Sequence, residues 1–232
     1  MGRIVAIGGG DLQTTKELNK YMIRRSKMKH PNVLFVGTAS GDAEKYIESI
    51  KNEFCSLGCD VKALCLVTEQ PSEPEIDLLF AWANIIYIGG GDTAFMMKKW
   101  KEYGIDSKLL TIYKNDTAVL SGLSAGAICW FNCGHSDSEA FSGKEERNYI
   151  FVEGMLDLHH FVLCPHYNEE GRDSFDTMMK DKQLVGLALE NETAFVEENG
   201  IITYIRSRKD AKAYKIAYQN GKMTKSEVTF VN

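Results

Sequence analysis

A serine between two glycines is the residue best placed to do chemistry in this sequence. The segment Gly122-Leu123-Ser124-Ala125-Gly126 fits the pattern G-x-S-x-G, with an apolar run before it at 118–120 and a helix-like run after it at 127–131. Glycine on both sides tolerates the crowding that arises when a strand turns sharply into a helix and exposes a serine. Ser124 is therefore the predicted nucleophile, and the N–H of Ala125 at the helix start is placed to stabilise an oxyanion. Taken alone, the motif is equally typical of a small-residue turn with a capping serine.

A glycine triplet is the second candidate feature. The segment Gly89-Gly90-Gly91-Asp92-Thr93 directly follows the apolar run 85–88. Glycines at a strand end let the backbone approach a ligand and point its N–H groups inward, so Gly91, or its neighbour Gly90, is the predicted second oxyanion donor. Residues 89–94 also fit G-x-G-x-x-A, but the acid that a dinucleotide site needs about 20 residues further on is missing. With no Walker lysine after the triplet either, nucleotide binding is disfavoured.

A base for Ser124 should be a histidine. The candidates are His30, His135, His159, His160 and His166. His166 ends the apolar run 161–163, and the carboxyl ends of parallel strands share the sheet edge where ligands bind, so His166 is predicted to lie beside Ser124. The pair at 159–160 begins that run and belongs at the opposite edge. His30 is expected to be solvated, whereas His135, in a polar loop after the serine helix, stays an alternative.

The third catalytic member should be a carboxylate that holds the other nitrogen of the imidazole. Glu190 is favoured because it ends the apolar run 184–189, again at a carboxyl end. Asp137 and Glu139 stay alternatives because their loop could bring a side chain back to the site. Arg172, six residues after His166, is predicted to bind a substrate carboxylate bidentately, and Arg147 is a weaker candidate.

The remaining pattern describes the scaffold that must position these residues. Apolar runs typical of buried parallel strands lie at 4–7, 33–36, 61–67, 85–88, 118–120, 161–163 and 184–189. Helical patterns lie between them at 12–28, 43–57, 93–101, 106–114 and 168–180. Antiparallel patterns follow at 193–196, 201–205 and 214–218, with Asn199-Gly200 as a hairpin turn. We therefore expect a three-layer α/β fold, with helices on both faces of one mostly parallel sheet and antiparallel C-terminal edge strands, as a single domain over residues 1–232.

Composition limits the partners. The chain is 44% hydrophobic and 25% charged with a net charge of -5, and its 27 Lys and Arg are scattered, so no nucleic-acid partner is expected. Glycines at 8–10 interrupt the N-terminal apolar run, which predicts a cytoplasmic protein without a membrane segment. The six cysteines include no C-x-x-C pair, so we expect reduced, buried thiols and no metal.

Together the motifs resemble the peptidase E family of aspartyl dipeptidases, serine peptidases of family S51. The matching segments are Gly-Gly-Gly-Asp-Thr, Gly-Leu-Ser-Ala-Gly-Ala, Cys-Pro-His-Tyr and Leu-Glu-Asn-Glu-Thr-Ala, and the resemblance covers about residues 1–205. It implies a fold similar to class I glutamine amidotransferases and a Ser124–His166–Glu190 triad, with Glu192 within a shift of the alignment. It also implies cleavage of dipeptides with an N-terminal aspartate, without metal or cofactor.

The sequence therefore predicts a serine hydrolase of small peptides that works through an acyl-enzyme, as a monomer or homodimer. The ordinary α/β-hydrolase family fits less well, because its order of serine, acid and histidine would need Asp137 or Glu139 as the acid. Two alternatives stay open. One is a non-catalytic α/β protein whose glycine turns hold a phosphate or carboxylate, and the other is a hydrolase of β-aspartyl peptides or another small amide.

Overall fold

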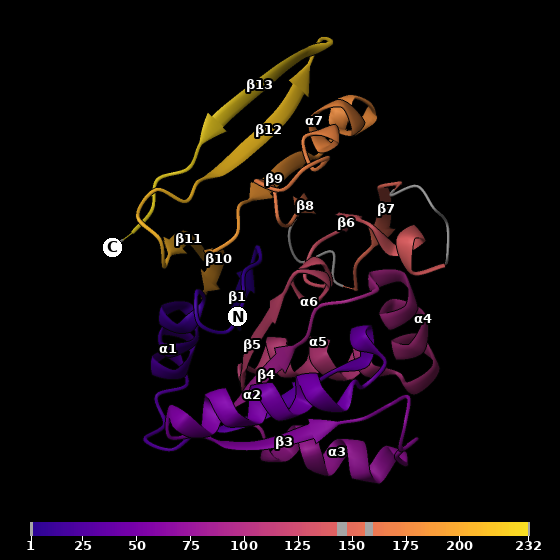
Figure 1. Cartoon of the computed structure of the whole chain (residues 1–232), viewed down its shortest axis with the longest axis vertical. Helices are drawn as coiled ribbons and strands as arrows, with labels where there is room; N and C mark the ends of the chain where they lie inside the picture. The colour runs from indigo at the N-terminus through magenta and orange to yellow at the C-terminus, as the bar shows by residue number, and fades with distance from the viewer. Residues whose placement is uncertain (1, 143–147, 156–159, 232) are drawn as a thin grey trace.

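The computed structural model describes residues 2–142, 148–155 and 160–231 (Figure 1). Its first sheet contains β1 (Arg3–Ile7), β2 (Asn32–Val36), β3 (Asp60–Leu64), β4 (Ile85–Ile88), β5 (Val119–Leu123), β10 (Thr193–Glu198) and β11 (Ile201–Arg206). Among the described strands the order is β11-β10-β1-β5-β4-β2-β3. The strands β1 to β5 run parallel, and β10 and β11 form an antiparallel edge beside β1, joined at the predicted Asn199-Gly200 turn.

Helices cover both faces of this sheet. The helices α1 (Lys16–Arg25) and α2 (Glu44–Ser56) pack on one face, against side chains such as Phe35 and Tyr87. The opposite face is covered by α3 (Glu73–Trp82), α4 (Thr93–Tyr103), α5 (Ile105–Asn115) and α6 (Ala125–Ile128). Successive residues of β4 alternate between the two cores, because neighbouring side chains of a strand point to opposite faces. This arrangement confirms the predicted three-layer α/β fold.

A second sheet was not predicted. It contains β6 (Cys133–Ser136), β7 (Ile150–Glu153), β8 (Phe161–Cys164), β9 (Val185–Leu189), β12 (Ala213–Gln219) and β13 (Lys222–Glu227). Their order is β13-β12-β9-β8-β6-β7 within the described residues, and Phe175 of the short helix α7 (Ser174–Met178) packs against them. The expected runs at 161–163, 184–189 and 214–218 therefore lie here and not in the first sheet. At residues 190–192, between β9 and β10, the chain passes from the second sheet back to the first, where the two sheets meet (Figure 1).

Some local features also differ from the expectations. Helix α3 was missed although Ser72 and Glu75 form a capping box at its start, a signal that the sequence carries. The expected helix 168–180 is only α7 followed by a 3-10 turn, η3 (Met179–Asp181). All six cysteines are free, and they are buried except for Cys55. Of the helices that the structure describes, none has the length and apolar character needed to cross a bilayer.

Candidate active site

Ser124 lies in a sharp turn between β5 and α6. Its backbone has φ 56° and ψ -114°, a left-handed conformation that is costly for a residue with a side chain. A Cβ on Gly122 would lie 2.1 Å from the carbonyl oxygen of Gly126, and a Cβ on Gly126 would lie 2.2 Å from that of Ile88. Both flanking positions therefore require glycine, and the turn presents Ser124 half-buried at the carboxyl end of β5.

Two backbone N–H groups near Ser124 are free to bind a ligand. In the part of the chain that the structure describes, neither the N–H of Gly91 nor that of Ala125 donates a hydrogen bond. Gly90 lies against the serine, since a Cβ on it would be 3.4 Å from the Ser124 Cβ, but its N–H donates to the hydroxyl of Tyr46 at 3.3 Å. Of the two glycines considered as oxyanion donors, Gly91 therefore has the free N–H.

The carboxyl end of β1 brings Ser124 and His166 together. The N–H of Ser124 donates to the carbonyl of Ile7 at 3.1 Å, and the N–H of His166 donates to the next carbonyl, that of Gly8, at 2.9 Å. A Cβ on Gly9 would lie 2.3 Å from Nδ1 of His166, so the imidazole packs directly on the backbone there. The described contacts include no hydrogen bond between the two side chains, and such bonds are often long before a substrate binds.

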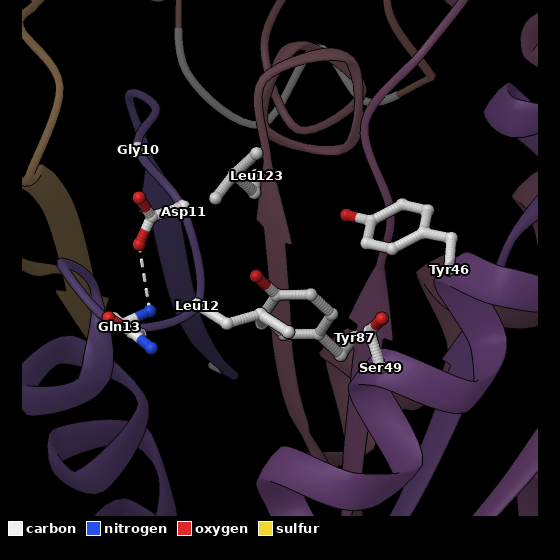
Figure 2. A pocket seen from close by; sticks show the side chains of 8 residues that line it. All are labelled: Gly10, Asp11, Leu12, Gln13, Tyr46, Ser49, Tyr87 and Leu123. Atoms are coloured by element: carbon white, nitrogen blue, oxygen red, sulfur yellow. Dashed lines mark hydrogen bonds between the residues drawn. The ribbon is translucent and has the colours of Figure 1, made fainter.

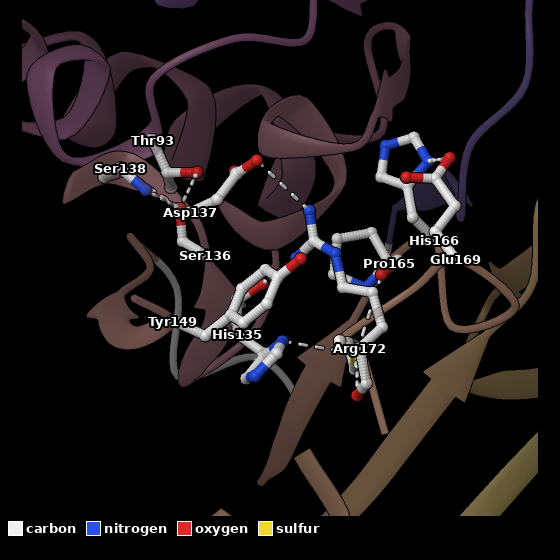
Figure 3. A network of polar contacts seen from close by, with 12 residues as sticks. Thr93, His135, Ser136, Asp137, Ser138, Tyr149, Pro165, His166, Glu169 and Arg172 are labelled. Carbon is white, nitrogen blue, oxygen red and sulfur yellow. Dashed lines mark hydrogen bonds and ion pairs between the residues drawn. The ribbon is translucent and has the colours of Figure 1, made fainter. Parts of the chain in front are cut away.

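The imidazole of His166 is held at Nδ1 by two residues that the sequence analysis missed. Its Nδ1 lies 2.7 Å from Oδ1 of Asn191. It also lies 3.0 Å from Oε1 of Glu169, which Figure 3 shows beside the ring. The amide Nδ2 of Asn191 donates to the same Glu169 oxygen at 3.0 Å, which fixes Oδ1 as the atom that faces the ring. Because both neighbours of Nδ1 are acceptors, the neutral imidazole carries its proton on Nδ1, which leaves the lone pair on Nε2.

The structure does not bring Glu190, the predicted triad acid, to His166. Oε2 of Glu190 accepts a hydrogen bond from the backbone N–H of Lys212 at 2.9 Å. Glu192 is engaged elsewhere as well, because its Oε2 lies 2.9 Å from Nε of Arg208. Asn191, between the two, is the residue of this segment that reaches the imidazole.

Arg172 is buried, and other residues of the chain already contact part of its guanidinium group. Its Nη1 donates to the carbonyl of His135 at 2.9 Å, and its Nη2 lies 3.6 Å from Oδ2 of Asp137. Its guanidinium lies 4.7 Å from the ring centre of Tyr149, and its Nε has no hydrogen-bond partner among the described residues (Figure 3). Asp137, an alternative triad acid, thus pairs with Arg172 in the structure. The other alternative, Glu139, lies in the short 3-10 helix η2 (Ser138–Ser142).

Buried hydroxyl groups join the Asp137 segment to the helix that follows the glycine triplet. Oγ of Ser136 lies 2.9 Å from Oγ of Ser138 and donates to Oγ1 of Thr93 at 3.1 Å. The backbone N–H of Ala94 donates to Oγ of Ser138 at 3.0 Å. These contacts hold Asp137, and with it the Arg172 guanidinium, against the start of α4.

His135 is a core residue and not the loop residue that the sequence suggested. It lies in β6, fully buried, with Nε2 3.1 Å from Oγ of Ser174 and its ring stacked on Tyr149. Burial, reinforced by the positive charge of Arg172, lowers its pKa to about 3, which makes it a weak base, and its described contacts are with core residues such as Ser174 and Tyr149 and not with Ser124. His30 is exposed, as expected. The predicted residues His159 and Arg147 lie outside the described residues.

A comparison with known proteins decides the family. The sequence model of peptidase family S51 matches residues 4–205. The chain belongs to peptidase family S51. It is 33% identical over 224 residues to the uncharacterized peptidase YgaJ of Bacillus subtilis (strain 168), covering 93% of this chain and 92% of the relative. It is 29% identical over 189 residues to the uncharacterized peptidase Lmo0363 of Listeria monocytogenes, covering 77% of this chain and 88% of the relative.

Solved structures agree on the fold of this S51 peptidase. A peptidase from an acI-B1 actinobacterium superimposes with a TM-score of 0.70 at 19% identity, covering 100% of this chain and 96% of the other. A protein of Listeria monocytogenes EGD-e, named as a candidate peptidase E, superimposes with a TM-score of 0.67 at 22% identity, covering 89% and 98%. These comparisons confirm the resemblance to the peptidase E family and the α/β fold.

Proposed function

We propose that this S51 peptidase is a serine peptidase that cleaves small peptides through an acyl-enzyme on Ser124. The observation that carries the proposal is the pairing at the end of β1, where adjacent carbonyls hold the backbones of Ser124 and His166. Ser124 has the geometry of a nucleophile elbow, and a strained residue at such a turn is typical of a functional site.

The reaction follows from the protonation of the imidazole. Nε2 of His166 takes the proton of the Ser124 hydroxyl while Oγ attacks the scissile carbonyl, and the N–H groups of Gly91 and Ala125 stabilise the oxyanion. His166 then gives the proton to the leaving amine. A water, deprotonated by the same Nε2, attacks the acyl-enzyme and releases the second product.

We assign the support of the imidazole to Glu169 and Asn191, in place of Glu190. When His166 accepts the proton of Ser124 it becomes positively charged, and the Glu169 carboxylate 3.0 Å from Nδ1 stabilises that charge. Asn191 holds the ring orientation through its 2.7 Å contact. The arrangement keeps a serine, a histidine and a glutamate, with a different glutamate from the one predicted.

The proposed substrates are dipeptides with an N-terminal aspartate, whose side-chain carboxylate would bind Arg172. The support is chemical: a guanidinium binds carboxylates in a planar, bidentate geometry, and Nε of Arg172 is buried without a partner among the described residues. The long 3.6 Å contact to Asp137 leaves Nη2 weakly paired.

Hydrolysis of Asp-Ala and Ala-Ala by purified wild type, Ser124→Ala, His166→Ala and Arg172→Lys tests the proposal. We expect wild type to prefer Asp-Ala and both catalytic variants to lose activity by at least about 10³-fold. Arg172→Lys keeps the charge but loses the planar fork, so its preference for Asp-Ala should fall about tenfold or more. Full activity in Ser124→Ala would contradict the serine mechanism, and an unchanged preference in Arg172→Lys would contradict the aspartate site.

A further inference from the structure

A pocket of about 500 Å³ adjoins the proposed catalytic residues and has no role in the chemistry described above (Figure 2). It is lined by Gly10, Asp11, Leu12, Gln13, Tyr46, Ser49, Tyr87 and Leu123. Figure 2 shows the segment from Gly10 to Gln13 on one side, Tyr46 and Ser49 of α2 on the other, and Tyr87 with Leu123 between them. Pockets of this size are large enough to take a small ligand or a large side chain.

Three lining residues connect the pocket to the reaction site, two by chain adjacency and one by a hydrogen bond. Leu123 directly precedes Ser124 in the chain. Tyr46 accepts the N–H of Gly90, the glycine that lies against the Ser124 side chain. Gly10 follows Gly9, the glycine on which the imidazole of His166 packs. A peptide bound at Ser124 therefore lies beside residues that adjoin the pocket lining.

The lining is mostly apolar. The side chains of Leu12 and Leu123 and the rings of Tyr46 and Tyr87 form its walls, and Tyr87 is fully buried. Burial raises the pKa of both tyrosines, so they are neutral. Asp11 supplies a negative charge at the rim, since hydrogen bonds from the backbone N–H groups of Thr14 and Gln13 lower its pKa.

We propose that this pocket is a subsite for a large apolar or aromatic side chain of the peptide substrate. The inference rests on the proposed function, which supplies the peptide. An acidic side chain is disfavoured because Asp11 would repel it and, among the described residues, no Lys, Arg or His lines the pocket. Since Arg172 is not among the lining residues, the aspartate and the apolar side chain of one dipeptide have separate sites.

Substitution at the pocket mouth tests the subsite. Ser49 is exposed on α2 and lines the pocket, so Ser49→Trp would fill the space with little effect on the fold. Glu48→Trp is the matched control, because Glu48 is the preceding residue, is exposed on the same helix and does not line the pocket. The readout is kcat/KM for the dipeptides Asp-Leu, Asp-Phe, Asp-Lys and Asp-Gly. The reversed dipeptides Leu-Asp, Phe-Asp, Lys-Asp and Gly-Asp are measured in the same way. Circular dichroism and thermal unfolding confirm that each variant is folded.

We expect wild type to favour Leu or Phe over Gly and Lys by about tenfold or more in one of the two orders. Ser49→Trp should reduce that ratio at least tenfold, whereas Glu48→Trp should keep it. Cleavage of the peptides with no preference for Leu or Phe, a preference for Lys, or a ratio unchanged in Ser49→Trp would overturn the subsite while leaving the proposed function intact. No cleavage of any peptide, together with a Ser124 that a serine-directed reagent does not label, would overturn both.

Discussion

The imidazole of His166 can act as a base only if its proton is on the nitrogen that faces away from Ser124. Asn191 and Glu169 achieve this, because both offer oxygen atoms to Nδ1 and neither can donate to it there. The backbone of His166 has φ 54°, in the left-handed region. In the proposed mechanism, catalysis depends on which ring nitrogen carries the proton.

Changes at the residues that hold Nδ1 should lower turnover and leave substrate binding nearly intact. We expect Asn191→Ala and Glu169→Gln each to lower kcat about 10- to 100-fold with little change in KM, because they orient the base without touching the substrate. Steady-state kinetics on the best dipeptide measures kcat and KM separately. Glu170→Gln, the next residue and also exposed, is the matched control for Glu169→Gln. A larger loss in Glu190→Gln than in Glu169→Gln would restore Glu190 as the triad acid.

Ser124 and His166, the proposed reacting residues, follow from the sequence more directly than Asn191 and Glu169, which contact the imidazole. Ser124 was predicted from its glycines and His166 from its position at a strand end, both of which are local signals. Asn191 and Glu169 are 22 residues apart, and they meet only because the loops after β8 and β9 come together. The segment Leu-Glu-Asn-Glu-Thr-Ala pointed to the right loop, but the position of each side chain within it depends on backbone geometry that no periodicity describes.

The turn between β5 and α6 is held by contacts in which backbone touches backbone. The missing side chain of Gly126 lets α6 approach the carbonyl of Ile88 on β4, and the missing side chain of Gly122 lets the two ends of the turn approach each other. Such contacts cannot relax by a change of rotamer. The strain at Ser124 is therefore maintained by the packing of β4, β5 and α6.

Adding one methyl group at this turn should be costly. We expect Gly126→Ala to lower the free energy of unfolding by about 2–3 kcal/mol and to abolish activity, since α6 must move away from β4. Gly58→Ala is the control for a purely conformational cost: Gly58 has a positive φ, which Gly126 does not, but a Cβ there meets nothing within 4 Å, so the cost should be about 1 kcal/mol with activity retained. Urea unfolding measures both. A loss of stability in Gly126→Ala no larger than that in Gly58→Ala would contradict the close contact as the reason for glycine at 126.

The molecule as a whole brings its two sheets together at the carboxyl end of β1. The first sheet supplies Ser124 and the glycine triplet, whereas the second supplies His166 after β8 and Asn191 after β9. The centre of the three-layer first sheet was predictable because β1, β2 and β4 consist mainly of continuous apolar runs. The second sheet was not, because β6, Cys-Gly-His-Ser, and β13, Lys-Met-Thr-Lys-Ser-Glu, have no strand-like pattern and depend on their neighbours.

The core of the second sheet should lose stability in acid through His135. Its pKa is about 3 in the fold against 6.5 for an ordinary histidine, so below pH 6.5 the unfolded chain binds a proton that the folded chain does not. The free energy of unfolding is therefore unaffected by His135 protonation above about pH 6.5. Between about pH 6.5 and pH 3 it falls as the pH falls, by up to about 1.4 kcal/mol per pH unit. His135→Phe should therefore show a shallower loss of unfolding free energy between pH 7 and pH 4.5 in urea titrations. His30→Gln, an exposed change, should follow wild type, and parallel curves for all three would contradict the role of His135.

The most direct test of the central claim, an activated Ser124, is covalent labelling by a small serine-directed phosphonate, followed by intact mass and peptide mapping. We expect one label per wild-type chain, on the peptide that contains Ser124, and no label in Ser124→Ala or His166→Ala. Labelling of another residue, or equal labelling of wild type and His166→Ala, would contradict a serine that is activated by His166.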